Sequence, residues 1–408
     1  MNTRRRFLDI AHFERPNDPF VWSIWTWRET ITRWKQEGDP VNFEGKQFNE
    51  FHLGYQDQRE HMTPNAATVG MADDGGEPFG PPLDPFFEEE VLEEDERYIV
   101  KRAKDGGVVK VLKNDPESMP MWLDFPIKTL GDWKEYKKRL DPFSPNRFPA
   151  GWDIISEDTT SFPVKRELRG KRFTKRDFAA GVMCATLYGG PRYHMGVEGL
   201  SYAIYDNIKL VDAMIEHQVY LSCEVLKQIF DAGITPDYAV IFEDMCYNHG
   251  PLVSPKFVRE HMVPGYRKIT DLLRSNGVDV IIVDTDGNFE KLIPIWLDCG
   301  INGNYPFEIA ANIDPVKLRR QYKDLIIVGG IDKRALAKGK SEIDGEIEKA
   351  RILLREGGYF PCVDHGIPPD VPYENFCYFI NELRKLSDHE ETRRLIPQGE
   401  ENAVPGVQ

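Results

Sequence analysis

The sequence predicts an α/β protein, a (β/α)8 TIM barrel with an N-terminal extension and a small antiparallel appendage. In its second half, short apolar segments each end on an acid or a histidine, at residues 239–244, 280–286, 303–308, 325–332 and 358–365. Their Val, Ile and aromatic content is typical of strands buried on both faces of a parallel sheet. From Phe178 onward such strands alternate with helices. Polar residues at the C-terminal ends of consecutive parallel strands are typical of the active site of this barrel.

The composition limits the partners of the chain. Of its 408 residues, 41% are hydrophobic, and the net charge is −15. Nucleic acids and anionic membranes are therefore not expected as partners, because phosphate groups are bound by basic patches. No membrane span is expected, since no run of 18 apolar residues exists. The basic residues 1–6 precede no apolar stretch, so no signal peptide is expected either. Six cysteines without CxxC spacing favour reduced thiols and a cytoplasmic location.

In the N-terminal half, amphipathic patterns predict helices over residues 5–12 and 30–36 and a first barrel strand over residues 20–25. The acidic run at residues 88–96 is interpreted as a solvated helix start or loop. Alternating segments with the turn signal Asp105-Gly106-Gly107 predict the antiparallel appendage, over about residues 97–125.

In the C-terminal half, the clearest helices are predicted over residues 211–230, 258–275 and 343–355. We interpret residues 1–386 as one domain and the polar residues 387–408 as a flexible tail.

Five short motifs occur in the order found in the uroporphyrinogen decarboxylase superfamily, at residues 188–191, 252–257, 286–288, 328–332 and 365–371. The chain resembles that superfamily over about residues 1–386. The resemblance implies a single (β/α)8 barrel and an enzyme. The superfamily includes the haem-pathway decarboxylase and cobalamin-dependent methyltransferases.

Two departures from the superfamily bear on the chemistry. The decarboxylases carry an arginine-rich segment after the first strand, whereas here residues 22–29 retain only Arg28. The methyltransferases carry a His-x-Cys-Gly-Asn zinc motif and a later cysteine ligand. Here the motif reads Asp284-Thr285-Asp286-Gly287-Asn288, and His365 takes the later position. The resemblance therefore implies the scaffold, while both diagnostic site chemistries are altered.

Asp284, Asp286 and His365 are candidate metal ligands. Side chains two apart at a strand end project to the same side. Two carboxylates and one imidazole suit a divalent metal with an open coordination position, Zn²⁺ first, with Fe²⁺ or Mn²⁺ as alternatives. Two other interpretations remain open: the aspartates cap the following helix, or they form an acid pair without metal.

The candidate catalytic residues are Glu243, Asp244, Tyr247 and Glu308. Glu243 and Asp244 end a strand, so one of them is expected to face the mouth of the barrel, at the C-terminal ends of its strands. There it would act as general base or as a further metal ligand. The alternative is a helix cap or a salt bridge to Lys256 or Arg259. Tyr247 is a candidate proton donor, and Glu308 is expected to face the pocket.

The candidate substrate-binding residues either stack on a ligand or hold its polar groups. Trp22 and Trp25 either wall a flat ligand or belong to the core or a lid. Arg28 and Arg192 could hold an acidic group. Tyr193 and Asn288 complete the set, and Asp332 is interpreted as a helix cap.

Three functions remain open. The first is metal-assisted methyl transfer involving a corrinoid or a small methyl donor, with a corrinoid protein as a partner. The second is decarboxylation of a porphyrinogen or a smaller acid, and the third is non-catalytic binding of a corrinoid or small molecule. An acid-lined mouth poor in arginine favours the first, because it repels a polycarboxylate. Monomer and homodimer are both open.

Overall fold

The computed structural model describes residues 3–21, 26–37, 83–116, 118–144, 179, 181–184, 186–231, 233 and 235–389. Its centre is a parallel sheet whose strands lie side by side in chain order. They are β5 (Gly181–Cys184), β6 (Tyr238–Phe242), β9 (Val280–Asp284), β10 (Gly303–Phe307), β11 (Ile326–Gly329) and β12 (Tyr359–Phe360). Parallel strands in chain order with intervening helices form the predicted (β/α)8 barrel.

Two isolated parallel bridges extend the barrel wall. Ile331 pairs with Val363, which lengthens the contact between the chain after β11 and the chain after β12. Thr26 pairs with Ile367, so the N-terminal segment lies beside the chain that follows β12. The predicted first strand, residues 20–25, falls mostly on residues 22–25, which lie outside the described residues.

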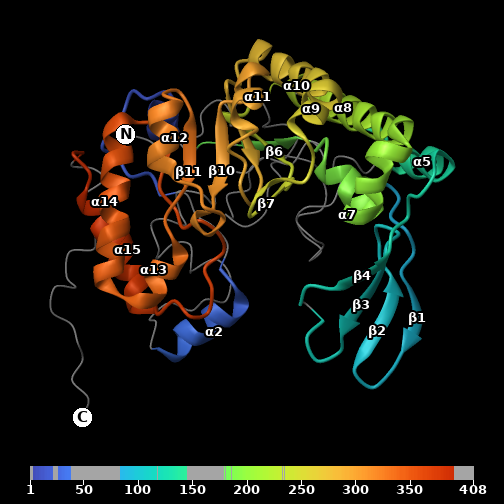
Figure 1. Ribbon diagram of the computed structural model, residues 1–408, viewed down its shortest axis with the longest axis horizontal. Helices are drawn as coiled ribbons and strands as arrows, with labels where there is room; N and C mark the ends of the chain where they lie inside the picture. The colour runs from blue at the N-terminus through green and yellow to red at the C-terminus, as the bar shows by residue number, and fades with distance from the viewer. Residues whose placement is uncertain are drawn as a thin grey trace.

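Helices lie on two sides of the sheet (Figure 1). On one flank lie α7 (Gly189–Asp206), α8 (Ile208–Asp231), α9 (Pro255–Phe257), the π-helical turn η3 (Val258–Met262), α10 (Val263–Ser275) and α11 (Ile293–Asp298). On the other lie α12 (Pro315–Gln321), α13 (Lys333–Lys338), α14 (Lys340–Glu356) and α15 (Tyr373–Lys385), while the short turn η4 (Ile309–Ala311) follows β10. The helices predicted over residues 211–230, 258–275 and 343–355 are confirmed.

Alternate residues of β9 serve two parts of the core. Ile281 and Val283 pack in the large cluster between the sheet and its helices. Val280 and Ile282 belong to a smaller cluster with α1 (Thr3–Ala11), the predicted N-terminal helix. This alternation is the expected consequence of a strand with one face toward the barrel interior and one toward the helices.

The second N-terminal helix, α2 (Arg28–Gln36), is hydrogen-bonded to the segment that follows β12. Thr30 Oγ1 donates a hydrogen bond to the Ile367 carbonyl at 2.8 Å, and Trp34 Nε1 donates one to the Val371 carbonyl at 2.7 Å. Trp34 is fully buried. The helix predicted over residues 30–36 is therefore confirmed.

The predicted appendage is a four-stranded antiparallel sheet that projects from the barrel below α7 (Figure 1). Its strands are β1 (Glu90–Glu94), β2 (Tyr98–Arg102), β3 (Val108–Leu112) and β4 (Met121–Asp124). It begins earlier than predicted, because β1 lies in the acidic run that was interpreted as a helix start or loop; that interpretation is wrong. Lys101, Arg102 and Lys113 form ion pairs with acids of this run, so an acidic strand has cross-strand partners.

The appendage is joined to the barrel through α5 (Leu130–Tyr136) and the turn η1 (Lys137–Arg139). Thr129 and Asp132 form a capping box at the start of α5. The buried rings of Trp133 and Tyr136 lie against His194 of α7. The Ile127 amide donates to the His194 carbonyl at 3.1 Å, so the appendage is fixed to the first turns of α7.

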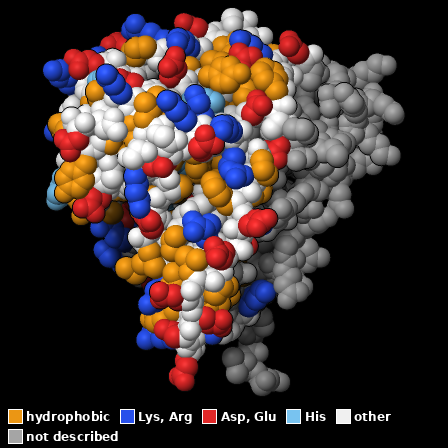
Figure 2. All heavy atoms as spheres, turned by 90° about the vertical axis from the view of Figure 1, so that its right-hand side faces the viewer, with side chains coloured by type: hydrophobic (Ala, Val, Ile, Leu, Met, Phe, Trp, Pro, Cys, Tyr) orange, Lys and Arg blue, Asp and Glu red, His pale blue; other side chains and the backbone are white. Residues whose placement is uncertain are grey.

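Figure 2, which faces the right-hand side of Figure 1, shows acidic and basic side chains interspersed, with apolar side chains gathered toward its lower part. Exposed apolar residues of the appendage include Val91, Met119 and Met121. No helix within the described ranges is long and apolar enough to cross a membrane.

Candidate active site

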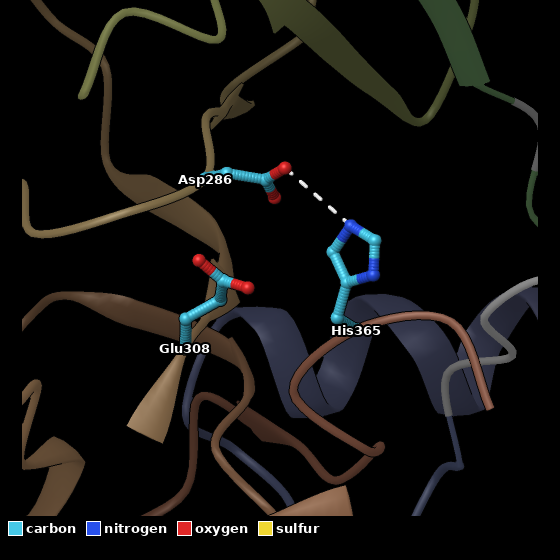
Figure 3. A group of neighbouring side chains, drawn as sticks. All are labelled: Asp286, Glu308 and His365. Atoms are coloured by element: carbon cyan, nitrogen blue, oxygen red, sulfur yellow. Dashed lines mark ion pairs between the residues drawn. The ribbon is translucent and has the colours of Figure 1, made fainter. Parts of the chain in front are cut away.

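Two carboxylates and one imidazole meet at the mouth of the barrel, by which we mean the segments that follow the C-terminal ends of its strands. Asp286 follows β9, Glu308 follows β10 and His365 follows β12, and Figure 3 shows the three side chains directed toward a common space. Their nearest ligand atoms all lie within 4.8 Å of one another. His365 Nε2 lies 3.4 Å from Asp286 Oδ2.

Glu308 is held in this group by the backbone of the β9 loop. Its Oε2 accepts a hydrogen bond from the Gly287 amide at 2.9 Å. Gly287 has a φ of +77°, and a Cβ there would lie 2.7 Å from the backbone of Cys246 and Tyr247. Only glycine fits this turn, so it lets the loop carry Asp286 toward Glu308.

The ionisation of the group is coupled. Burial alone would lower the pKa of His365, but its hydrogen bond to Asp286 and the charge of that carboxylate outweigh burial and raise the pKa. Burial raises the pKa of Glu308, and the nearby charge of Asp286 adds to it, while the Gly287 hydrogen bond opposes the rise. A protonated His365 beside Asp286 therefore offsets part of the local negative charge.

Asp284, the third predicted ligand, is not part of this three-residue group. It is the last residue of β9. Burial raises its pKa well above the ordinary value, and the charges of Asp286 and Asp244 add to the rise. Burial thus favours the protonated carboxylic acid at this position.

Asp244 and Arg192 form an ion pair at the same end of the barrel. Arg192 Nη2 lies 2.5 Å from Asp244 Oδ2, and Asp244 has a φ of +40°. Burial raises the pKa of Asp244, although the Arg192 charge opposes the rise. The salt bridge expected with Lys256 or Arg259 is wrong, because among the described residues these bases pair with Glu260 and Asp298.

An aromatic wall adjoins this ion pair. The guanidinium of Arg192 lies 5.0 Å from the ring centroid of Tyr193, and that ring stacks on Phe242, with 6.5 Å between centroids. Tyr193 and Phe242 are both half-buried. The wall therefore offers part of its ring surface to a ligand.

Glu243, by contrast, is fully buried in the scaffold. Its two oxygens accept hydrogen bonds from the amides of Leu187, Tyr188 and Gly189 and from the Tyr266 hydroxyl, at distances from 2.7 to 3.2 Å. These contacts hold the turn that leads into α7 and carries Arg192. The structure thus brings Asp244, and not Glu243, to the other acids of the mouth.

The remaining predicted residues lie outside the group of Asp286, Glu308 and His365 or outside the described residues. The Asn288 side chain links the loop after β9 to the turn η4, since Nδ2 donates to the Ala311 carbonyl and Oδ1 accepts from the Glu290 amide. Tyr247, in the hairpin of β7 (Cys246–Tyr247) and β8 (Gly250–Pro251), is 59% exposed. Trp22 and Trp25 lie outside the described residues, and Arg28 is described only as the first residue of α2. Asp332 caps α13, as predicted.

Two further residues of the mouth were not among the candidates. Asp364 is buried and accepts hydrogen bonds from the amides of Ile309 and Lys333. Lys333 Nζ lies 3.7 Å from Asp364 Oδ1 and 3.9 Å from Glu308 Oε1. Both residues follow strand ends, the position that marked the other candidates. Asp364 even adjoins His365, so this signal could have identified them.

Comparisons with known proteins identify the family of this chain. The uroporphyrinogen decarboxylase (URO-D) family model matches residues 181–386, the part of the chain that contains the barrel strands and the mouth. The chain belongs to the uroporphyrinogen decarboxylase family.

Curated relatives are named uroporphyrinogen decarboxylase. The one from Nautilia profundicola is 23% identical over 194 residues, which cover 45% of this chain and 51% of the relative. The one from Acidiphilium cryptum is 26% identical over 189 residues, covering 46% and 50%. The matches thus span about half the length of each relative.

A solved structure, a methyltransferase from Methanosarcina mazei, has the same fold. It aligns with a TM-score of 0.52 and 14% identity over 95% of this chain and 98% of that one. At this identity the likeness concerns the fold alone.

Proposed function

We propose that this chain is a metal-dependent methyltransferase that moves a methyl group between small molecules, one of them a corrinoid or a small methyl donor. The observation that carries the proposal is the group of Asp286, Glu308 and His365, which follow the C-terminal ends of β9, β10 and β12. Superfamily members are enzymes, and the family match makes catalysis the starting point. The reaction itself is the proposal.

The residues present fit a divalent cation. Oxygen and nitrogen donors in a two-to-one ratio suit Zn²⁺, Fe²⁺ or Mn²⁺. Ligand atoms within 4.8 Å need only small side-chain rotations to approach one centre at about 2.0–2.2 Å. Asp286, Glu308 and His365 would hold the ion, and Glu308 takes the place that the sequence suggested for Asp284. When bound, such an ion lowers the pKa of a coordinated thiol or water and so supplies a nucleophile near neutral pH.

The charges of the mouth also favour a cation. Its acids outnumber its bases: Asp244, Asp284, Asp286, Glu308 and Asp364 face Arg192, Lys333 and His365. Buried carboxylates that lack a counter-charge are costly. A divalent cation would supply a counter-charge for Glu308, which otherwise shares Lys333 with Asp364.

The chain's own residues would bind and orient the substrate. The half-buried rings of Tyr193 and Phe242 offer an aromatic surface beside the Arg192–Asp244 pair. The Gly287 amide keeps Glu308 in position, and Glu243 fixes the turn that carries Arg192. A corrinoid, whose side chains are mostly neutral amides, would avoid the like-charge repulsion that carboxylates meet here. If the corrinoid is carried by a protein, that corrinoid protein would be the partner of this chain.

Decarboxylation of a smaller acid is the second candidate. The observation that favours it is Arg192, whose buried Nε has no hydrogen-bond partner among the described residues. A guanidinium with an unused donor can bind a carboxylate. The names of the curated relatives point the same way.

Two measurements separate the candidates. Metal content of protein purified without chelator should approach one divalent ion per chain if the first proposal holds. Turnover is then compared with uroporphyrinogen under reducing conditions and with a methylated corrinoid plus a thiol or folate acceptor. Demethylation of the corrinoid without loss of carboxyl groups supports methyl transfer. Efficient decarboxylation of uroporphyrinogen would show that the acids of the mouth do not repel a polycarboxylate. It would also favour decarboxylation over methyl transfer.

A further inference from the structure

Lys333 lies near two acids that differ in burial. It is the first residue of α13, and its side chain is only 19% exposed. Its Nζ is 3.9 Å from Glu308 Oε1 and 3.7 Å from Asp364 Oδ1. The ammonium is thus close to one proposed metal donor and to a carboxylate outside the donor group.

Asp364 is a fixed partner. Its side chain is 0% exposed, Oδ2 accepts from the Ile309 amide at 3.0 Å, and Oδ1 accepts from the Lys333 amide at 3.1 Å. These bonds join the segments after β10, β11 and β12. Among the described residues, Glu308 accepts one hydrogen bond, from the Gly287 amide to Oε2, and its other oxygen, Oε1, faces the ammonium.

We propose that Lys333 is a displaceable counter-ion that sets the metal affinity of the mouth. This inference rests on the proposed metal centre. Lys333 neutralises Glu308 until a divalent cation takes over that carboxylate, and the ammonium then pairs with Asp364 alone. Lys333 is therefore a positioning residue, because it acts through Glu308 and Asp364.

The physical reason is that metal and ammonium compete for the same oxygen. A positive charge held beside a donor weakens the binding of a divalent ion, and the interaction is strong where water is largely excluded. Asp364 limits the loss, since it gives the displaced ammonium a partner at a distance it already has. Without Asp364 the lysine would have Glu308 as its remaining carboxylate, and metal binding would leave a partly buried charge uncompensated.

The test measures the dissociation constant of Zn²⁺ at one fixed pH, by competition with a chromophoric chelator, in the full chain. Lys333→Met should bind Zn²⁺ about tenfold more tightly, and Asp364→Asn about tenfold more weakly, than the unmodified protein. Lys333→Arg keeps the charge and should not tighten binding. Lys227→Met, which removes a lysine paired with Glu224 on the outer helix α8, is the matched control and should change nothing. Circular dichroism and thermal melting confirm that each variant is folded.

The double variant Lys333→Met/Asp364→Asn tests the displacement itself. If Asp364 acts partly as the partner of the displaced lysine, its replacement should weaken binding less in the Lys333→Met background than in the unmodified protein. Equal effects in both backgrounds would overturn the displacement.

Other outcomes separate the failure of this inference from failure of the metal proposal. If the unmodified protein binds Zn²⁺ and Lys333→Met binds it no more tightly, the role of Lys333 is wrong and the metal centre stands. If only Lys333→Met binds Zn²⁺, the counter-ion role stands and the native metal centre is wrong. If no variant binds Zn²⁺ or Mn²⁺ at millimolar concentration, both are wrong.

Discussion

The two ends of the barrel handle charge in opposite ways. At the N-terminal ends of the strands, α1 covers the interior, and buried Asp18 accepts hydrogen bonds from both Arg6 and Arg15. Arg4 and His12 of the same region contact Asp237 and Asp279, which directly precede β6 and β9. Each of these acids has a basic partner.

At the mouth the acids outnumber the bases, and two of the bases, Lys333 and His365, contact proposed metal donors. Buried charges that are paired with one another stabilise the fold, whereas a group of acids with raised pKa values at strand ends is typical of a functional site. We therefore propose that the N-terminal end stabilises the barrel and that the mouth holds the active site, as is usual for this fold. The following experiments test that division.

The largest effect on stability should come from the N-terminal end. Asp18→Asn removes the carboxylate shared by Arg6 and Arg15, whose side chains are only 7% and 8% exposed. Leaving buried charges without their partner should lower the free energy of unfolding by about 3–5 kcal/mol. Glu14→Gln, which removes an exposed partner of Arg5, is the control and should cost at most about 1 kcal/mol. Urea denaturation measures both, and a loss in Asp18→Asn no greater than in the control contradicts the assignment.

The next effect should appear at the mouth, in metal binding and not in stability. Asp286→Ala, His365→Ala and Glu308→Gln should each weaken metal binding by at least about 100-fold, because loss of a direct ligand costs no less than loss of an outer partner. Asp284→Asn should change it far less. Metal content and thermal melting of the four variants test this. If Asp284→Asn proves as damaging as Glu308→Gln, the ligand set suggested by the sequence is the better one.

A smaller effect on stability is expected where α7 contacts the end of the appendage. Gly196 interrupts α7 with a φ of +73°, and a Cβ there would collide with the ring of Phe125. Gly196→Ala should cost about 2–3 kcal/mol, since strain and overpacking add. Gly199→Ala on the same helix is the control, because the nearest atom to a new Cβ is 3.7 Å away. It should be neutral or stabilise by up to about 1 kcal/mol in urea denaturation. Equal costs at both positions would show that the contact with Phe125 does not constrain α7.

The smallest effect is a pH dependence at the same junction. Burial lowers the pKa of His194 to about 3. Because the folded pKa lies below the unfolded value of about 6.5, unfolding takes up a proton at acidic pH. The contribution of His194 to the free energy of unfolding is therefore fully present above about pH 6.5. Below that pH it falls by about 1.4 kcal/mol per pH unit. His194→Phe should flatten this slope between pH 6.5 and 5 in urea denaturation. An unchanged slope would mean that His194 is protonated in the folded protein.

The amino-acid pattern alone determined the barrel and the end at which its candidate site lies. Apolar runs ending on acids mark parallel strands, and the side chains that follow neighbouring strands meet at one edge whatever the loops do. Asp286, Glu308 and His365 were all among the candidates for this reason. The antiparallel appendage was equally visible, because alternation and the Asp105-Gly106-Gly107 turn are local signals.

Only the tertiary structure decided which side chains share an environment. Beyond the end of β9 the alternation of a strand no longer applies, and the turn at Gly287 carries Asp286 to Glu308 without Asp284. Adjacent acids were likewise separated: Glu243 is buried in hydrogen bonds to the turn before α7, while Asp244 pairs with Arg192. The acidic run became β1 because bases on β2 and just after β3 lie opposite it. Each of these arrangements depends on contacts between residues distant in the chain. Local sequence patterns do not predict such contacts.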